Sequence, residues 1–178
     1  MSILNHHYGC VIKYDLLTKF QSKTPVCTNN VKKLVLNLSK KEISLKRLLL
    51  FGAALELISY QNTSITLSGN SNLSFKIKKG APNGCKVILR SKRSFYFLFN
   101  LISKIFPSVK QFEGFTNIKS KKPKTFSFKL NDLLNFTEIE TQYALFKVIF
   151  QLNISIITHT ECVHNSNVLL TSLRFPIK

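Results

Sequence analysis

Residues 75–90 read FKIKKGAPNGCKVILR, and this stretch decides how the chain folds. Two short runs, SFKIKK (74–79) and GCKVILR (84–90), alternate apolar and basic side chains on either side of a Gly-Ala-Pro-Asn-Gly corner. Such alternation is typical of strands with one buried face, and the glycines and the proline favour a turn between them. The stretch therefore predicts a cationic β-hairpin.

The second strand of this hairpin has two unlike faces, because successive side chains of a strand point to opposite sides. The apolar face is formed by Cys85, Val87 and Leu89. The opposite, open face is formed by Lys86, Ile88 and Arg90. Two more cations, Lys92 and Arg93, follow in the first turn of the next predicted helix. A basic surface is therefore expected where this strand ends.

The rest of the chain supplies the other elements. Alternation predicts strands at residues 31–38, 64–67, 125–130 and 152–160. Helical spacing predicts helices near the N-terminus and at residues 44–61, 91–106 and 161–173. We expect an α+β fold in one domain, residues 1–178. It is a two-layer sandwich whose mostly antiparallel sheet has helices on one face and an open polar and basic face on the other.

Charge is concentrated in the middle of the chain. The formal net charge is +18, and residues 71–130 hold 14 of the 26 Lys and Arg but a single acid, Glu113. Clustered cations without acids indicate a polyanionic partner. The phenylalanines fall on apolar faces, so base stacking is not indicated. The pattern favours recognition of the backbone and shape of folded RNA.

Several other functions are not supported. Acids are few and isolated, and GAPNG lacks the spacing of a phosphate-binding loop, so we expect no enzyme and no cofactor. His159, Cys162 and His164 could ligate zinc but lack a fourth ligand, so we expect no metal. Four scattered cysteines, Cys10, Cys27, Cys85 and Cys162, predict reduced and mostly packed thiols.

Membrane and targeting signals are also not expected. The best apolar run, LLLFGAALELIS, contains Glu56 and is shorter than the roughly 18 residues needed to span a bilayer. The N-terminus lacks a targeting pattern, which predicts use in the compartment of synthesis. Abundant Phe, Ile, Leu, Asn, Lys and Ser are typical of an AT-rich genome, which suggests an organelle.

The stretch FKIKKGAPNGCKVILR, followed by SFYFLFNLISKIFPSVKQFEGF, resembles the signature of the large-subunit ribosomal protein five family, which binds 5S rRNA. YDLLTKF, VKKLVLNL, FTEIE, LNISIITHT and LLTSLRFPIK resemble further family segments in the same order, over residues 8–178. The resemblance implies a structural protein of the central protuberance. Its implied partners are 5S or large-subunit rRNA, P-site tRNA, neighbouring large-subunit proteins and a protein of the small-subunit head.

The resemblance also implies roles for individual residues. Family positions for 5S rRNA fall on Asn37, Gln61, Ile88 and Arg90, and Ile88 replaces a threonine hydroxyl. Together with the cations found by alternation, the expected rRNA-binding set is Asn37, Gln61, Lys86, Ile88, Arg90, Lys92 and Arg93. The expected tRNA and intersubunit loop is Lys76, Lys78, Lys79, Gly80, Pro82 and Asn83.

Two segments depart from the family pattern. SKKEI (39–43) replaces a glycine-rich turn, and SKKPKTF (120–126) loses both glycines of its counterpart. Such drift suits a mitochondrial member, encoded in the organelle and placed in the matrix ribosome; a plastid or bacterial member is the alternative. A free-standing basic RNA-binding module outside the ribosome is the alternative function.

Overall fold

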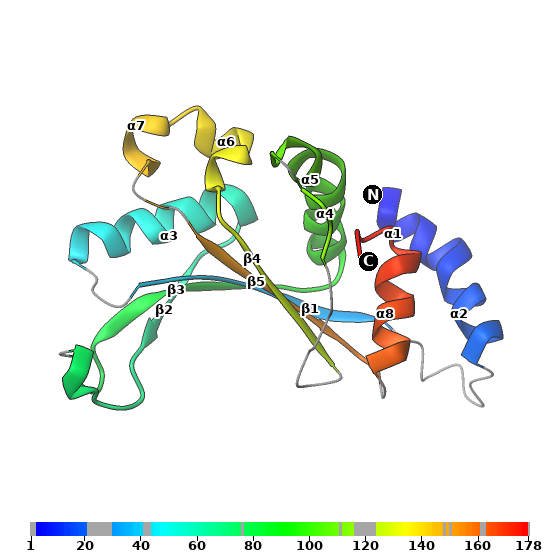
Figure 1. Ribbon diagram of the computed structural model, residues 1–178, viewed down its shortest axis with the longest axis horizontal. Coiled ribbons are helices and arrows are strands. Elements are labelled where there is room, and N and C mark those ends of the chain that lie inside the picture. The colour runs from blue at the N-terminus through cyan, green and yellow to red at the C-terminus, as the bar shows by residue number, and fades with distance from the viewer. Residues whose placement is uncertain are drawn as a thin grey trace. The chain divides into compact units, whose positions relative to one another are not determined.

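The computed structural model describes residues 3–20, 30–40, 44–75, 77–110, 112–115, 124–147, 149, 151–160 and 163–177. Five strands form one antiparallel sheet in the order β2-β3-β1-β5-β4 (Figure 1). The strands are β1 Val31–Ser39, β2 Ser64–Leu67, β3 Pro82–Leu89, β4 Thr125–Leu130 and β5 Leu152–Thr158. Helices pack on this sheet, which confirms the predicted α+β class.

Two compact units divide the chain. Unit 1 comprises residues 1–34, 89–127 and 155–178, and unit 2 comprises residues 35–88 and 128–154. Every strand except β2 contributes residues to both units. Each unit is described by itself below.

Unit 1 contains three helical segments. The first runs through α1 Ile3–His7, a π-helical turn at Tyr8–Ile12 and α2 Lys13–Phe20. The second runs through α4 Lys92–Asn100, a π-helical turn at Leu101–Ile105 and α5 Phe106–Ser108. The third is α8 Val163–Ser172. The first two segments pack together, and the rings of Tyr8 and Phe95 lie 5.3 Å apart between their centroids.

Phenylalanine rings form much of the core of unit 1. Phe106, Phe115, Phe126 and Phe175 contact one another with centroid separations of 5.3–5.7 Å. Phe112 stacks on Phe106 at 4.9 Å. Edge-to-face and offset pairs of this kind add about 0.5–1.5 kcal/mol each beyond the burial of their area. We name these five residues the phenylalanine cluster.

The C-terminal segment completes this cluster. Phe175 follows α8 directly, and its N–H donates to the Leu170 carbonyl at 2.9 Å. The Phe115 N–H donates to the Pro176 carbonyl, also at 2.9 Å, and Phe115 pairs with Ile177 as a parallel bridge. The end of the chain is thereby held against the segment that follows α5.

Unit 2 is built on α3, which runs from Leu45 to Ser59. Ser44 caps its start by accepting a hydrogen bond from the Arg47 N–H, and Tyr60 ends it in the left-handed conformation. The predicted apolar face is buried, as Leu48, Phe51, Leu55 and Ile58 show. A 3-10 turn at Leu133–Asn135 and two short helices, α6 Thr137–Glu140 and α7 Tyr143–Phe146, were not predicted. Both short helices pack against α3.

The hairpin exists, but its first strand is not the predicted one. β3 pairs with β2, so that Ser64 lies opposite Lys86 and Thr66 opposite Gly84. The predicted strand over 74–79 is wrong: residues 73–75 form a 3-10 turn, and Asn72 pairs with Ile77 inside the connecting loop. The described side chains of this loop are largely exposed, so the short alternation meets no core that would hold it in a strand.

Two smaller expectations are also corrected. The segment over 91–106 is apolar almost all round in sequence, yet Tyr96, Ser103 and Lys104 are exposed and one side reaches solvent. Cys10 is exposed, whereas a packed thiol was expected. Cys85 is buried as predicted; burial, and next the Glu56 carboxylate, raise the pKa of its thiol. Cys27 and Cys162 lie outside the described residues.

Candidate nucleic-acid interface

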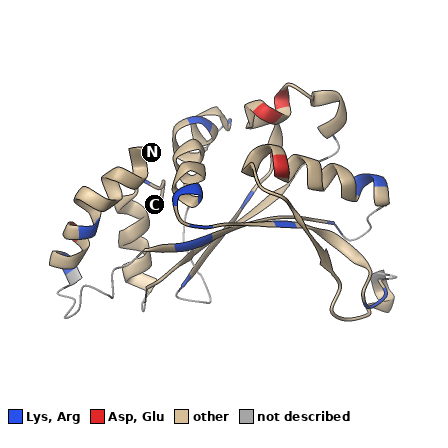
Figure 2. Ribbon diagram, turned by 180° about the vertical axis from the view of Figure 1, so that it is seen from behind, with Lys and Arg blue, Asp and Glu red and all other residues tan. Residues whose placement is uncertain are grey.

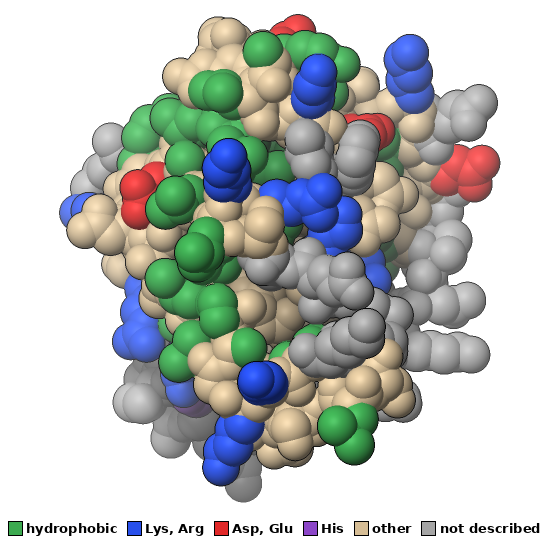
Figure 3. Space-filling model, turned by 90° about the vertical axis from the view of Figure 1, so that its left-hand side faces the viewer, with side chains coloured by type: hydrophobic (Ala, Val, Ile, Leu, Met, Phe, Trp, Pro, Cys, Tyr) green, Lys and Arg blue, Asp and Glu red, His purple; other side chains and the backbone are tan. Residues whose placement is uncertain are grey.

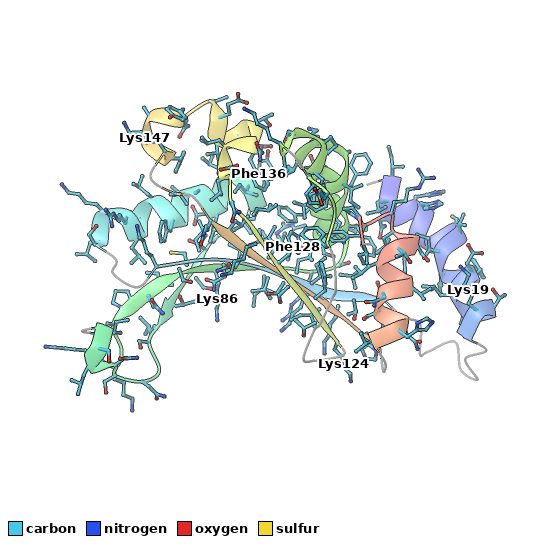
Figure 4. The ribbon with its side chains drawn as sticks, in the orientation of Figure 1. Lys19, Lys86, Lys124, Phe128, Phe136 and Lys147 are labelled. Atoms are coloured by element: carbon cyan, nitrogen blue, oxygen red, sulfur yellow. The ribbon has the colours of Figure 1, made fainter. Side chains whose placement is uncertain are left out.

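Alternation along the strands gives unit 2 an open face. Leu36, Leu38, Cys85, Val87, Leu152 and Ile154 are buried on the opposite side of the sheet. The intervening side chains form what we name the open face of unit 2: Val35, Asn37, Ser64, Lys86, Ile88, Lys129 and Asn153. Figure 4 shows Lys86 and Phe128 on opposite sides of the sheet. The predicted residues Asn37, Lys86 and Ile88 therefore share one face.

The acids of unit 2 lie elsewhere. None of the seven residues of the open face is acidic, whereas Glu56 is on α3, and Glu138 and Glu140 are on α6 (Figure 2). Protein donors also satisfy two of these carboxylates. Glu56 accepts from the N–H and hydroxyl of Thr63 at 3.0 and 3.2 Å, and Glu138 accepts from the Tyr60 hydroxyl at 3.3 Å. The open face thus keeps its positive charge, which suits a polyanion.

Exposed apolar side chains lie on the helices and on the edge strand of unit 2. They are Leu45 and Leu49 on α3, Ile65 and Leu67 on β2, and Tyr143 and Leu145 on α7. Figure 3 shows apolar side chains over this side of the molecule. None of these six belongs to the open face, and they carry no charge that could hold phosphate.

A strained turn presents the cations of unit 1. Ser91 joins β3 to α4 with φ 52° and ψ −131°, a conformation that glycine adopts readily and residues with a Cβ do not. Its carbonyl accepts hydrogen bonds from the Ser94 N–H at 3.1 Å and the Ser94 hydroxyl at 2.6 Å. Arg90, Lys92 and Arg93 are exposed on either side of Ser91. We name these three residues the cationic turn.

The cations of this turn work against the helix on which they lie. The N-terminal end of a helix has a partial positive charge, so Lys92 and Arg93 in the first turn of α4 add repulsion of a few tenths of a kcal/mol. Ser91 supplies no side-chain cap. Cations, strain and an uncapped helix end together raise the local positive potential. An anion placed at the turn would reduce the repulsion.

We expect Ser91→Gly to stabilise the protein by about 1 kcal/mol, because glycine adopts the observed φ and ψ without strain. Chemical denaturation of the purified protein measures the change. Ser91→Ala is the matched control, since it removes the hydroxyl but keeps the Cβ, and it should bring no gain. Equal stability of the glycine and alanine variants would show that the turn is not strained.

The predicted tRNA and intersubunit residues lie in and beside the β2–β3 loop, residues 68–81. Lys78, Lys79 and Gly80 are exposed, as is Pro82 at the start of β3, whereas Asn83 is half-buried. Lys76 lies outside the described residues.

Hydrogen bonds close the base of this loop. The Ser68 N–H donates to the Ala81 carbonyl at 2.8 Å, and the Gly80 N–H donates to the Ser68 carbonyl at 2.9 Å. Gly80 has φ +81°, which explains the glycine at this corner.

Other predicted residues are placed less directly. Gln61 follows the left-handed Tyr60 and is half-buried, and its backbone exchanges two 3.3 Å hydrogen bonds with the Ser59 hydroxyl. Its contact with RNA stays a prediction. His159 and His164 are exposed, and no group of three potential metal ligands occurs among the residues that the structure describes. Within that part of the chain, no helix is long and apolar enough to cross a membrane.

Some residues of the interface carried no functional prediction. Asn153 and Ser155 were expected to point outward from the 152–160 strand, but no role was assigned to them. In unit 1 the Ser127 hydroxyl donates to the Ser155 hydroxyl at 2.8 Å, which links neighbouring strands β4 and β5. Ser64 joins the open face of unit 2 because it pairs with Lys86, and pairing partners are not visible in sequence.

Comparison with known proteins gives consistent matches. Residues 82–177 match the family model for the C-terminus of ribosomal protein uL5. The chain is 32% identical to large ribosomal subunit protein uL5m of Reclinomonas americana, over 99% of this chain and 98% of the relative. It is 34% identical to uL5 of Baumannia cicadellinicola over 100% and 98%, and 31% identical to uL5 of Blochmanniella floridana over 100% and 94%.

Proposed function

Because the chain belongs to the uL5 family of large ribosomal subunit proteins, a non-enzymatic family of ribosome constituents, we propose that it binds rRNA through two surfaces. One is the open face of unit 2, and the other is the cationic turn of unit 1. The observation that carries the proposal is the absence of acids from the open face in a chain of net charge +18. RNA phosphates would supply the counter-charge that the protein lacks there.

The chemistry of these surfaces favours contact with backbone and sugar over base stacking. All seven residues of the open face are aliphatic, hydroxyl, amide or lysine side chains. Arg90 offers a planar guanidinium that can bind a phosphate with two parallel hydrogen bonds. Such a surface recognises the shape of a folded RNA, and 5S rRNA in the central protuberance is the proposed target.

The β2–β3 loop has a different proposed role. Its exposed Lys78 and Lys79 lie beyond a hydrogen-bonded base, so the loop can reach an RNA away from the sheet. We propose that it contacts P-site tRNA and the small-subunit head. The proposed location is the mitochondrial matrix ribosome, which the similarity to the R. americana protein supports; bacterial relatives of similar identity keep the bacterial alternative open.

Sucrose-gradient sedimentation of a lysate from the native source tests the ribosomal role. The protein should sediment with large subunits at low and moderate salt. A free-standing RNA-binding module, the alternative, would stay near the top of the gradient. Sedimentation away from the large subunit would therefore contradict the ribosomal proposal.

We expect Arg90→Ala to weaken rRNA binding about tenfold, because one charge-assisted phosphate contact is lost. The slope of log K against log salt should fall in magnitude by about 1, as for any single phosphate contact. Filter binding at several salt concentrations measures both quantities. Lys147→Ala is the matched control: it removes an exposed cation at the end of α7, away from the open face, and should leave both unchanged. An Arg90→Ala variant with wild-type affinity and slope would refute this contact.

A further inference from the structure

Two asparagines on the open face of unit 2 have unusual side chains. Asn37 lies on β1 and Asn153 on β5, which are neighbouring strands of the sheet. Both side chains are half-buried, yet the Oδ1 atom of each is buried and accepts no hydrogen bond from the described residues. A buried acceptor without a donor destabilises the free protein by about 1–3 kcal/mol. The free protein therefore carries an unmet demand for hydrogen-bond donors at this face.

The chemistry of RNA narrows what can meet that demand. Phosphate oxygens only accept hydrogen bonds, so they cannot satisfy a carboxamide oxygen. Lys86 and Lys129, on the same face, are suited to phosphates. A ribose 2′-hydroxyl both donates and accepts, which matches the oxygen and the NH2 group of a carboxamide. Rows of 2′-hydroxyls lie in the wide, shallow minor groove of an RNA helix, which a flat sheet face can reach.

We propose that Asn153, together with Asn37, binds ribose 2′-hydroxyls and makes the open face selective for RNA over other polyanions. The proposal rests on the rRNA binding described above and assigns to Asn153 a role in it. Rotation about χ2, a broad torsion in asparagine, brings the buried oxygen toward the approaching sugar. The lysines then account for affinity through charge, and the asparagines account for the recognition of ribose.

The test uses an in vitro transcript of bacterial 5S rRNA and the same transcript with fluorine at every 2′ position. Fluorine leaves an A-form helix but removes the hydroxyl donor. Asn153→Ala should bind the natural transcript about tenfold more weakly than wild type. On the fluorinated transcript the two proteins should bind alike. The salt slope should match wild type, because no phosphate contact is lost.

Asn153→Leu gives an independent readout that also excludes misfolding. It removes the buried acceptor while keeping a similar volume, so the melting temperature of the free protein should rise by a few degrees as RNA affinity falls. Asn167 is the matched control, since its Oδ1 is likewise buried without a donor, but it lies on α8 of unit 1. Asn167→Leu should leave RNA affinity unchanged.

Each outcome has a distinct meaning. If wild type does not bind the natural transcript, the proposed 5S rRNA function fails and this inference falls with it. If wild type binds and Asn153→Ala binds equally well, the inference alone is overturned, and the oxygen is satisfied by water in the free protein. An equal loss for Asn153→Ala on both transcripts would show that the residue contacts RNA without reading the 2′-hydroxyl, which overturns the proposed selectivity.

Discussion

Phe175→Ala is expected to lower the free energy of unfolding by about 3–5 kcal/mol, the usual cost of deleting a buried aromatic ring. Phe175 is only 3% exposed and contacts Phe106, Phe115 and Phe126 at centroid separations of 5.3–5.4 Å. The change removes three aromatic pairs and leaves a cavity that a cluster of rigid rings cannot fill. Since a domain of this size is stable by only about 5–15 kcal/mol, the loss is a large fraction of the total.

Urea denaturation measures this loss, and two variants calibrate it. Phe175→Leu keeps most of the volume and should cost about 1–2 kcal/mol. Tyr96→Ala removes an aromatic ring of the same unit that is about half exposed, and should cost less than about 1 kcal/mol. A Phe175→Ala variant as stable as Tyr96→Ala would mean that the C-terminal segment does not close the phenylalanine cluster.

Gly84→Ala is expected to cost about 3 kcal/mol or more, through a backbone clash. A Cβ at this position would meet the Leu38 carbonyl oxygen and would lie 2.9 Å from the Cα and 3.0 Å from the Cβ of Ser39. These atoms belong to β1, the neighbour of β3 in the sheet. A single methyl group would therefore force the two strands apart where the open face of unit 2 begins.

Gly69→Ala is the matched control for that variant. No heavy atom lies within 4 Å of its added Cβ, and its backbone is outside the left-handed region. Its unfolding free energy should stay within about 0.5 kcal/mol of wild type. If thermal and urea denaturation show the same stability for Gly84→Ala and Gly69→Ala, the close approach of β3 to β1 does not exist.

Sequence predicted the fold best where alternation is long. The strands around Leu36, Phe128 and Ile154 lie within two residues of their expected ends, because six or more alternating residues specify both a strand and its buried face. The strand expected at 74–79 failed because its pattern is equally compatible with an exposed loop. The partner of β3 depended on pairing with Ser64–Leu67, which is a long-range contact. Helices α6 and α7 have four residues each and so carry no periodicity to detect.

The candidate site was predicted in outline. Alternation correctly assigned Lys86 and Ile88 to one side of β3 and Cys85, Val87 and Leu89 to the other. The strain at Ser91 and the unsatisfied oxygen of Asn153 could not be predicted, because backbone angles and missing donors arise only after the chain has folded. The corner GAPNG shows the same limit. Sequence identifies its glycines, but only the structure separates the positive φ of Gly80 from the close contact of Gly84.

The central claim is that RNA provides the counter-charge for the acid-free face. A cryo-electron microscopy map of the large subunit from the native source tests it most directly. The account predicts RNA backbone within hydrogen-bonding distance of Lys86 on the open face of unit 2 and of Arg90 in the cationic turn. A map in which protein or bulk solvent covers both residues would contradict it.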